Sequence, residues 1–364
     1  MRFQIILLLV TFATLSQQQR QGGRWMPRAS KETLTKLDGE IRNVLKAKPE
    51  FIGGFVRLAF HDCIGKGRCD GCINLHNEDN KGLEVYIPTL EKIYQGYKRR
   101  ITRADLFAFA GVVAANYASS NSTDVFNHKR FRVGRDDCSR DGQETDRKEN
   151  FPGPNMQNVN EVWAFFKKAF GLTLKETVAL MGAHSLGKLR SKNSGFEGPW
   201  IADVVQKGGA NILDSRYYLE IVAVPWFMKK MKQCPKRHQW QRNGPSMGWG
   251  NTANGINPQP DNVLISSDAA LAVNLELDGN GAFKPGKECV MCSIQDNKQP
   301  EGVTLPCCDE ASAGRQICID YALDNSLWMK DFENVFYKMI DNPDDLLTFP
   351  VSSSSVPPKR RKSN

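Results

Sequence analysis

Apolar residues recur every three or four positions in several parts of the chain, a spacing that predicts amphipathic helices. We expect the first helix over residues 31–48, ended by Pro49, and a second over Phe55–Cys63, released by Gly53-Gly54. A last helix is expected over 327–340. Strictly alternating runs, which would indicate strands, are few. The pattern therefore predicts a mainly α protein. The apolar side of the first helix consists of Leu34, Leu37, Ile41, Val44 and Leu45.

The stretch from Leu172 to Trp200 begins as a buried helix with a capping box formed by Thr173 and Glu176. We expect this helix to carry His184 and to stop at Asn193-Ser194-Gly195. A single imidazole on an apolar helix is most often a core histidine that is merely hydrogen-bonded. The alternative is that His184 is a ligand.

A second histidine occurs in the sequence FVRLAFHDC, where Arg57 and His61 lie four residues apart and therefore on one face of the second helix. Burying two cationic groups among apolar neighbours costs several kcal/mol unless something compensates. One explanation is a structural ion pair with a carboxylate. The other is a site that uses both side chains.

GAHSLGK followed by NSGFEGPW resembles the proximal segment of the plant, fungal and bacterial haem peroxidase superfamily, near the branch of cytochrome c and ascorbate peroxidases. RLAFHD (57–62) resembles its distal helix, and Asn80-Lys81-Gly82-Leu83 its N-x-G-L motif. The resemblance covers about residues 30–275 and 325–345. It implies a two-domain helical haem-peroxidase fold, with haem b between a distal half (30–165) and a proximal half (166–345).

The resemblance also implies the roles of individual residues. His184 would ligate the haem iron, with Trp200 sixteen residues later lying against it. Arg57 and His61 would be the catalytic pair, and Asn80 would hold His61. The expected haem-contacting residues are Phe60, which matches the secreted branches, Pro152 and Ser185; Asp268 is the expected carboxylate behind His184.

In the expected mechanism His61 acts as base and then acid, and Arg57 stabilises negative charge on the leaving oxygen. Asp268 would accept the second ring proton of His184. Trp200 would donate its indole N–H to Asp268 and relay one electron, unless it is only a core aromatic. Tyr217, Tyr218 and Trp226 are expected to be core aromatics.

Asp62 and Asp70 lie on a short loop whose counterpart in the secreted branches binds calcium. Cys72 replaces a serine ligand of that pattern, so a surface acidic loop is the alternative. The resemblance also implies a Cys63–Cys69 disulfide.

An insertion over 277–321 contains five of the chain's ten cysteines. Cys289-x-x-Cys292 alone suggests zinc, but the adjacent Cys307-Cys308 suits tetrahedral geometry poorly, which favours disulfides. A redox-active CxxC is disfavoured because no βαβ pattern surrounds it.

The N-terminus predicts a signal peptide over residues 1–16 and hence a secreted, disulfide-containing chain, with a sequon at Asn121. No later stretch is long and apolar enough to predict a membrane span. Residues 346–364 are expected to be a disordered basic tail. The formal charge of +9 allows an anionic extracellular polymer as partner, whereas the expected secretion argues against nucleic acid.

The expected function is reduction of hydrogen peroxide by a secreted haem peroxidase. Ascorbate-using relatives carry Arg where this chain has Asn193, so the donor is expected to be a phenol, a protein tyrosine or a redox protein. The alternatives are a catalytically silent peroxidase-fold matrix or polyanion-binding protein, and a disulfide-rich adhesive protein in which the motifs are accidental.

Overall fold

The computed structural model describes residues 28–65, 69–119, 125–138, 151–202, 207–242, 262–294, 298–300, 302–341 and 347–352. The expected signal peptide, the sequon at Asn121 and most of the basic tail lie outside these residues. Within them, no helix is long and apolar enough to cross a membrane.

Helices make up most of the regular secondary structure in the described residues, which confirms the mainly α prediction. The α-helices are α1 Lys31–Ala47, α2 Phe51–Cys63, α3 Ile87–Tyr97, α4 Arg103–Ser119, α5 Val159–Phe170, α6 Leu174–Met181, α7 Ser191–Ser194, α8 Arg216–Ala223, α9 Ser266–Ala269, α10 Arg315–Leu323 and α11 Asn325–Asp341. The strands are β1 Lys188–Leu189, β2 Gly198–Pro199, β3 Phe227–Lys230, β4 His238–Gln241 and β5 Val263–Leu264.

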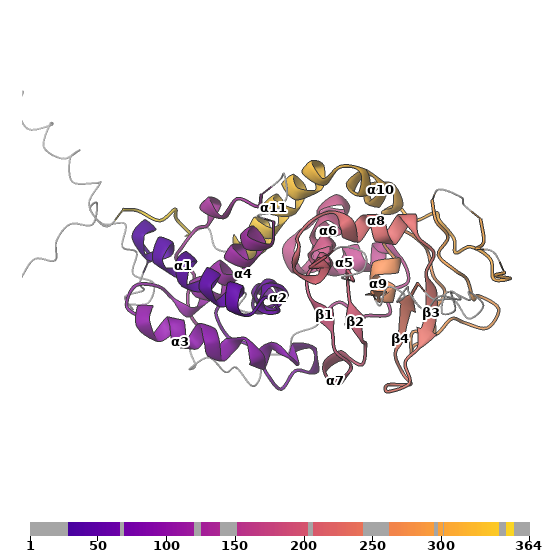
Figure 1. Ribbon diagram of the computed structural model, residues 1–364, viewed down its shortest axis with the longest axis horizontal. Coiled ribbons are helices and arrows are strands. Elements are labelled where there is room, and N and C mark those ends of the chain that lie inside the picture. Colours follow the sequence, from indigo (N-terminus) through magenta and orange to yellow (C-terminus); the bar gives the residue numbers. More distant parts are fainter. Residues whose placement is uncertain are drawn as a thin grey trace, which may run out of the picture.

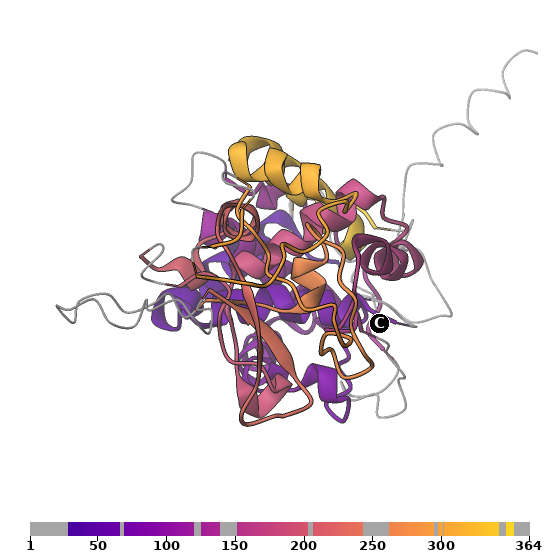
Figure 2. The same cartoon turned by 90° about the vertical axis from the view of Figure 1, so that its right-hand side faces the viewer.

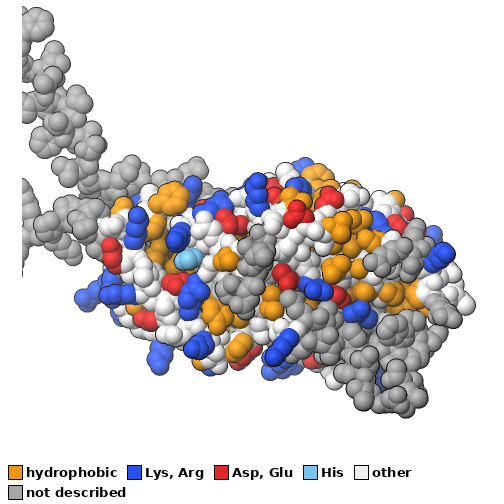
Figure 3. All heavy atoms as spheres, turned by 45° about the horizontal axis from the view of Figure 1, so that its top comes forward, with side chains coloured by type: hydrophobic (Ala, Val, Ile, Leu, Met, Phe, Trp, Pro, Cys, Tyr) orange, Lys and Arg blue, Asp and Glu red, His pale blue; other side chains and the backbone are white. Residues whose placement is uncertain are grey.

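The elements form two groups that α11 connects. In Figure 1, α1 to α4 lie together at the left, the elements from α5 to β5 lie at the right, and α11 runs along the top between them. The view turned by 90° again places α10 and α11 along the top (Figure 2). On the face shown in Figure 3, basic and acidic side chains are interspersed.

The core of the first group is the contact between α2 and α4. Helix α4 is buried almost all round, as expected for a helix enclosed by others. Gly111 allows the close approach, because a Cβ at this position would lie 2.6 Å from the Cβ of Ala59 on α2.

Helix α2 begins at Phe51, earlier than the Phe55 that the Gly53-Gly54 pair predicts. Both glycines lie inside the helix because other groups pack closely against them. A Cβ at Gly53 would lie 2.9 Å from the backbone of Gly187, and one at Gly54 would overlap the ring of Tyr86. Here the glycines indicate close packing instead of a helix start.

Helix α6 has the predicted capping box between Thr173 and Glu176 but ends at Met181. The prediction that His184 lies on this helix is therefore wrong: it lies in a 3₁₀ turn, Gly182–Ser185. Two buried side chains donate hydrogen bonds to carbonyls in the last turn of α6 and so help to end the helix there. The hydroxyl of Tyr218 donates to Val178 O at 2.6 Å, and Trp328 Nε1 donates to Ala179 O at 3.1 Å.

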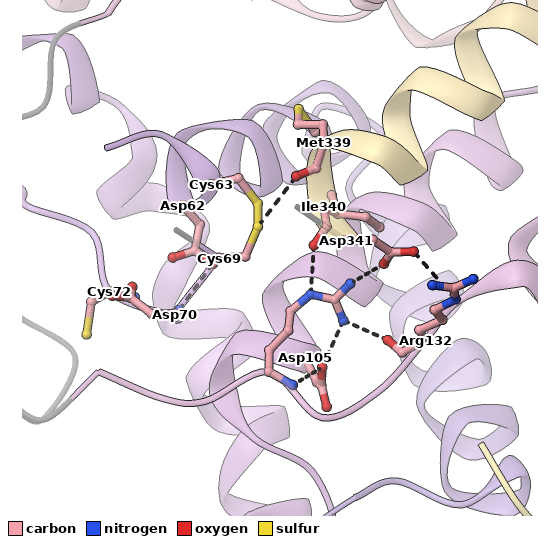
Figure 4. The surroundings of a disulfide bond; sticks show 12 residues. Asp62, Cys63, Cys69, Asp70, Cys72, Asp105, Arg132, Met339, Ile340 and Asp341 are labelled. Atoms are coloured by element: carbon pink, nitrogen blue, oxygen red, sulfur yellow. Dashed lines mark hydrogen bonds and ion pairs between the residues drawn. A yellow bond between two sulfur atoms is a disulfide. The ribbon is translucent and has the colours of Figure 1, made fainter. Parts of the chain in front are cut away.

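A buried ion pair joins α4 to the C-terminal end of α11. Arg135 Nη1 lies 2.9 Å from Asp105 Oδ1, and both side chains are almost fully buried. The guanidinium also donates to Ile340 O and pairs with Asp341 (Figure 4). Burial raises the pKa of Asp105, and Arg135 opposes that rise.

The strands form two small antiparallel sheets, β1-β2 and β3-β4-β5. The insertion packs beside β3, where Trp226 pairs with Met291. Thr348 pairs with Val133, so residues 347–352 belong to the folded part, contrary to the expectation of a disordered tail from residue 346.

Eight of the ten cysteines form disulfides. The pair Cys63–Cys69 is present as the resemblance implies. The predicted disulfides of the insertion are also confirmed and exclude the zinc alternative there. The pairs are Cys63–Cys69, Cys72–Cys138, Cys289–Cys308 and Cys292–Cys307; Cys234 and Cys318 are free.

Candidate active site

Arg57 and His61 lie one turn apart on α2, and a single short segment holds both of them. The guanidinium of Arg57 donates to Asp79 O at 2.6 Å and to Lys81 O at 3.1 Å. His61 Nδ1 lies 2.7 Å from Oδ1 of Asn80, between those two carbonyls in sequence. The positions of the two side chains are therefore set together.

The orientation of Asn80 fixes the tautomer of His61. The Nδ2 of Asn80 donates to Asn74 O at 2.9 Å, so Oδ1 must face the imidazole. An amide oxygen only accepts, and His61 Nδ1 therefore carries a proton. Its Nε2 is left with a lone pair, as a general base requires.

The pKa of His61 is well below its usual value because of burial and, secondly, the positive charge of Arg57. Hydrogen bonding to Asn80 opposes this decrease. The imidazole is consequently neutral near pH 7 and able to accept a proton.

Aromatic rings surround this histidine. The ring of Phe151 stacks on His61 with centroids 4.4 Å apart, and Phe60 lies edge-on at 5.5 Å. Phe60 also lies 6.0 Å from Phe166 on α5. Pro152 follows Phe151 and is half-buried. The stacking of Phe151 on His61 was not predicted from the sequence, in which only the adjacent Pro152 matched the family pattern.

His184 is held from behind by a buried carboxylate. Its Nδ1 lies 2.8 Å from Oδ1 of Asp268, which is fully buried on α9, while the side chain of His184 is 32% exposed. Because Nδ1 is engaged, Nε2 is the nitrogen available to a metal.

Tyr217 completes the surroundings of this carboxylate. Its hydroxyl donates to Asp268 Oδ1 at 2.6 Å, and Ile265 N donates to Oδ2 at 2.8 Å. The indole of Trp200, the expected donor, is not among the hydrogen-bond partners of Asp268 in the described part of the chain. Tyr217 is buried, as predicted for a core aromatic, but its role at this site was missed, because no sequence spacing relates it to Asp268.

Trp200 lies against His184 as the resemblance implies. The two rings are parallel to within 6°, with centroids 4.0 Å apart. The β1-β2 ribbon positions the indole, since Trp200 N donates to Gly187 O at 3.3 Å and Pro199 pairs with Lys188. Trp200 is itself buried.

Helix α2, which carries His61, and the segment after Asn80 each contact the segment that follows His184. Gly53 of α2 packs on Gly187, three residues after His184. Gly82 adopts a left-handed φ of +92°, and a Cβ there would overlap Asn193 Nδ2 and lie 3.6 Å from Arg57 Nη1. A side chain at position 82 would be strained by the left-handed backbone and would require Asn193 to move.

Ser185 provides a test of whether this region suits a bound cofactor. Its Oγ is buried beside His184 and has no hydrogen-bond partner among the described residues. Buried polar groups are almost always satisfied, so an orphaned hydroxyl next to a partly exposed imidazole fits a polar group of a bound molecule. The residues present thus suit a haem held by His184.

The two expected calcium ligands lie beside the first disulfide (Figure 4). Asp62 Oδ2 accepts from Gly71 N at 3.1 Å, and Asp70 Oδ1 accepts from Cys72 N at 3.1 Å. Both aspartates are buried. Cys72, which replaces a serine ligand, is bonded to Cys138 and so is no thiolate ligand.

Comparison with known proteins places these residues in a family context. A family model described as peroxidase matches residues 37–279. The chain is 30% identical over 202 residues to L-ascorbate peroxidase 3 of Arabidopsis thaliana, covering 52% of this chain and 62% of that one. It is 28% identical over 244 residues to a putative heme-binding peroxidase of Yarrowia lipolytica, covering 60% and 75%.

A mitochondrial cytochrome c peroxidase of Candida glabrata is 32% identical over 151 residues, covering 42% of this chain and 38% of that one. The chain spans 54 to 62% of the length of four ascorbate peroxidases that it matches.

Proposed function

Because the chain belongs to the peroxidase family, we propose that it is a secreted haem peroxidase that reduces hydrogen peroxide at the expense of a one-electron donor. The observation that carries the proposal is the pairing of His184 with the buried carboxylate of Asp268, in a chain that also places Arg57, His61 and Asn80 together.

In this proposal the haem lies between residues 30–165 and 166–345, with His184 Nε2 as iron ligand. Phe60, Pro152 and Ser185 would contact the group. When bound, the haem iron supplies the redox chemistry that takes two electrons from the site and passes them to peroxide.

The chain's own residues move protons and stabilise charge. The Nε2 of His61 takes a proton from one oxygen of hydrogen peroxide and delivers it to the other as the O–O bond breaks. Arg57 stabilises the negative charge that develops on the departing oxygen. One peroxide, two protons and two electrons give two waters, so two one-electron donors are oxidised per cycle.

On the other side, Asp268 accepts the Nδ1 proton of His184 and increases the electron donation of the imidazole. Trp200, stacked on that imidazole, is the proposed relay for single electrons from the donor. The donor class that fits is a phenol, a protein tyrosine or a redox protein, since Asn193 stands where ascorbate-using relatives carry an arginine.

Secretion is supported by the apolar N-terminal segment and by four disulfides, which persist in oxidising compartments. A calcium ion at Asp62 and Asp70 remains part of the proposal, supported by their burial.

The test is a visible spectrum of the purified full-length chain, loaded with haem, before and after peroxide. We expect a Soret band that is displaced when peroxide is added and restored by guaiacol, with two guaiacol oxidations per peroxide. The His184→Ala variant should bind haem more weakly and show an altered Soret band.

The outcomes separate the alternatives. Haem uptake without turnover would favour a silent peroxidase-fold protein. No Soret band at all would contradict the proposed cofactor, and with it the whole function.

A further inference from the structure

Two segments of the described chain carry a strong excess of positive charge. One, residues 188–200, comprises β1, α7 and β2; the other, 227–241, is the β3-β4 hairpin. Together they contain eight basic residues and one acidic residue, Glu197, whereas the whole chain has a formal charge of +9. We call the eight the basic face: Lys188, Arg190, Lys192, Lys229, Lys230, Lys232, Lys236 and Arg237.

The two segments pack directly against each other. A Cβ at Gly195, immediately after α7, would lie 2.9 Å from Cγ of Arg237 in the hairpin turn. The guanidinium of Arg237 lies over the ring of Phe196 at 5.4 Å. Glu197 and Gln239 exchange two hydrogen bonds, of 3.0 and 2.9 Å. The basic residues thus belong to one continuous part of the surface.

These cations are available to a partner. All of the basic face is exposed except Arg237, which is half-buried. Within the described residues, none of the eight forms an ion pair with a carboxylate. Across the face shown in Figure 3, by contrast, the two signs are mixed.

The basic face adjoins the proposed electron relay. Lys188 pairs with Pro199, the residue before Trp200, and α7 carries Asn193, which lies against Gly82 near Arg57. A partner that covers the face therefore lies over the ribbon that holds Trp200 against His184.

We propose that the basic face is the docking surface for an acidic redox protein that serves as the electron donor. This inference rests on the proposed peroxidase function and specifies the class of its second substrate. Eight cations on a strand ribbon and a neighbouring hairpin match a large anionic surface better than one small anion. Such a surface raises association rates by ten- to a thousandfold at low ionic strength.

Position favours a donor protein over an anionic polymer. A polymer would need only charge, at any place on the molecule. A donor must approach the site, and the charge lies on the segment that leads to Trp200.

The experiment compares oxidation of two ferrous haem proteins of opposite charge, acidic cytochrome b5 and basic cytochrome c, by the haem-loaded chain and peroxide. We expect faster oxidation of cytochrome b5, with a rate that falls as salt screens the charges. The triple variant Lys229→Glu, Lys230→Glu, Lys232→Glu should lower that rate at least tenfold at low salt. Replacing the same three lysines by glutamine should give an intermediate rate.

The matched control reverses Lys31, Lys36 and Lys46 on α1, which are exposed and change the net charge equally. This control should have little effect on the rate of cytochrome b5 oxidation. Calorimetric titration with ferric cytochrome b5 should rank the affinities of the variants in the same order as their rates. Guaiacol oxidation should be unchanged in every variant, which separates this inference from the peroxidase function itself.

If the charge reversals on the hairpin and on α1 lowered the rate of cytochrome b5 oxidation equally, net charge alone would be acting and the inference would be overturned. Salt-independent oxidation of cytochrome b5 would do the same. Loss of heparin binding in the hairpin variant, with unchanged cytochrome b5 oxidation, would make the face a polymer-binding surface instead.

Discussion

Tyr217 and His184 bond the same carboxylate oxygen, Oδ1 of Asp268, at 2.6 and 2.8 Å. A second donor on that oxygen withdraws negative charge from it and weakens its pull on the proton of His184. Tyr217 is therefore a positioning residue that moderates the basicity of the proposed iron ligand.

We expect Tyr217→Phe to strengthen the bond between Asp268 and His184, because the competing donor is removed. The reduction potential of the bound haem should become more negative, and the iron–histidine stretching frequency should rise. Spectroelectrochemistry and resonance Raman spectroscopy measure these quantities. Tyr218→Phe removes a neighbouring hydroxyl that donates to carbonyls of α6 and is not among the described partners of Asp268, so it is the matched control. Identical potentials in both variants would assign Tyr217 a purely structural role.

The pKa of His61 predicts how peroxide reduction depends on pH. The neutral imidazole is the active form, and burial keeps its pKa well below the usual 6.5. The rate of the first step, measured by stopped-flow absorbance, should therefore be flat above pH 6.5 and fall only in more acidic solution. His61→Leu should slow this step by roughly 10² to 10⁴-fold, since the general base is lost. A rate that declines with a midpoint above pH 6.5 would contradict the assignment.

The lowered pKa of His61 also makes the stability of the folded chain depend on pH. Below pH 6.5 the unfolded chain binds a proton at this histidine that the folded chain does not, so the free energy of unfolding should fall as the pH decreases.

Trp200→Phe tests the electron relay. The first step with peroxide should remain nearly intact, because Trp200 stacks on His184 and is not among the described hydrogen-bond partners of Asp268. The electron paramagnetic resonance spectrum recorded after peroxide addition should change, since the radical site is removed. An unchanged spectrum would exclude Trp200 as the relay and direct attention to Tyr217.

Calcium at Asp62 and Asp70 is tested by removing it. If the ion is bound, a chelator should lower the melting temperature of the chain, and Asp62→Asn should abolish that difference. Equal melting with and without chelator in the unaltered chain would count against the site.

The buried pair of Asp105 and Arg135 predicts a stability effect remote from the active site. Asp105→Ala leaves a buried guanidinium without one of its two carboxylates and should cost about 3–5 kcal/mol of unfolding free energy. Lys175→Ala breaks a more exposed pair with Asp331 and should cost less than about 1 kcal/mol. Denaturant titration measures both, and similar costs would refute the importance of burial.

The sequence predicted best what depends on local chemistry. The capping box at Thr173 and the apolar stripe of α1 involve neighbours in sequence, and both are present. The Cys63–Cys69 pair is also close in sequence.

The errors concern contacts between distant segments. Helix α6 ends before His184 while side chains from α8 and α11 bond its last carbonyls, which no local pattern indicates. The glycines of α2 suggested a break, but their real partners are Gly187 and Tyr86. Tyr217 reaches Asp268 across 51 residues, so its role at the site required the folded chain.

The disulfides fall into two sets that do not connect with each other. Two close loops within residues 63–138, and two lie within 289–308. Cys63 is two residues from His61, so recombinant production in a reducing cytoplasm would leave the loop after that histidine without its Cys63–Cys69 disulfide. Preparations for enzymology should therefore come from a periplasmic or secretory host, where an inactive sample could be attributed to the protein and not to its expression.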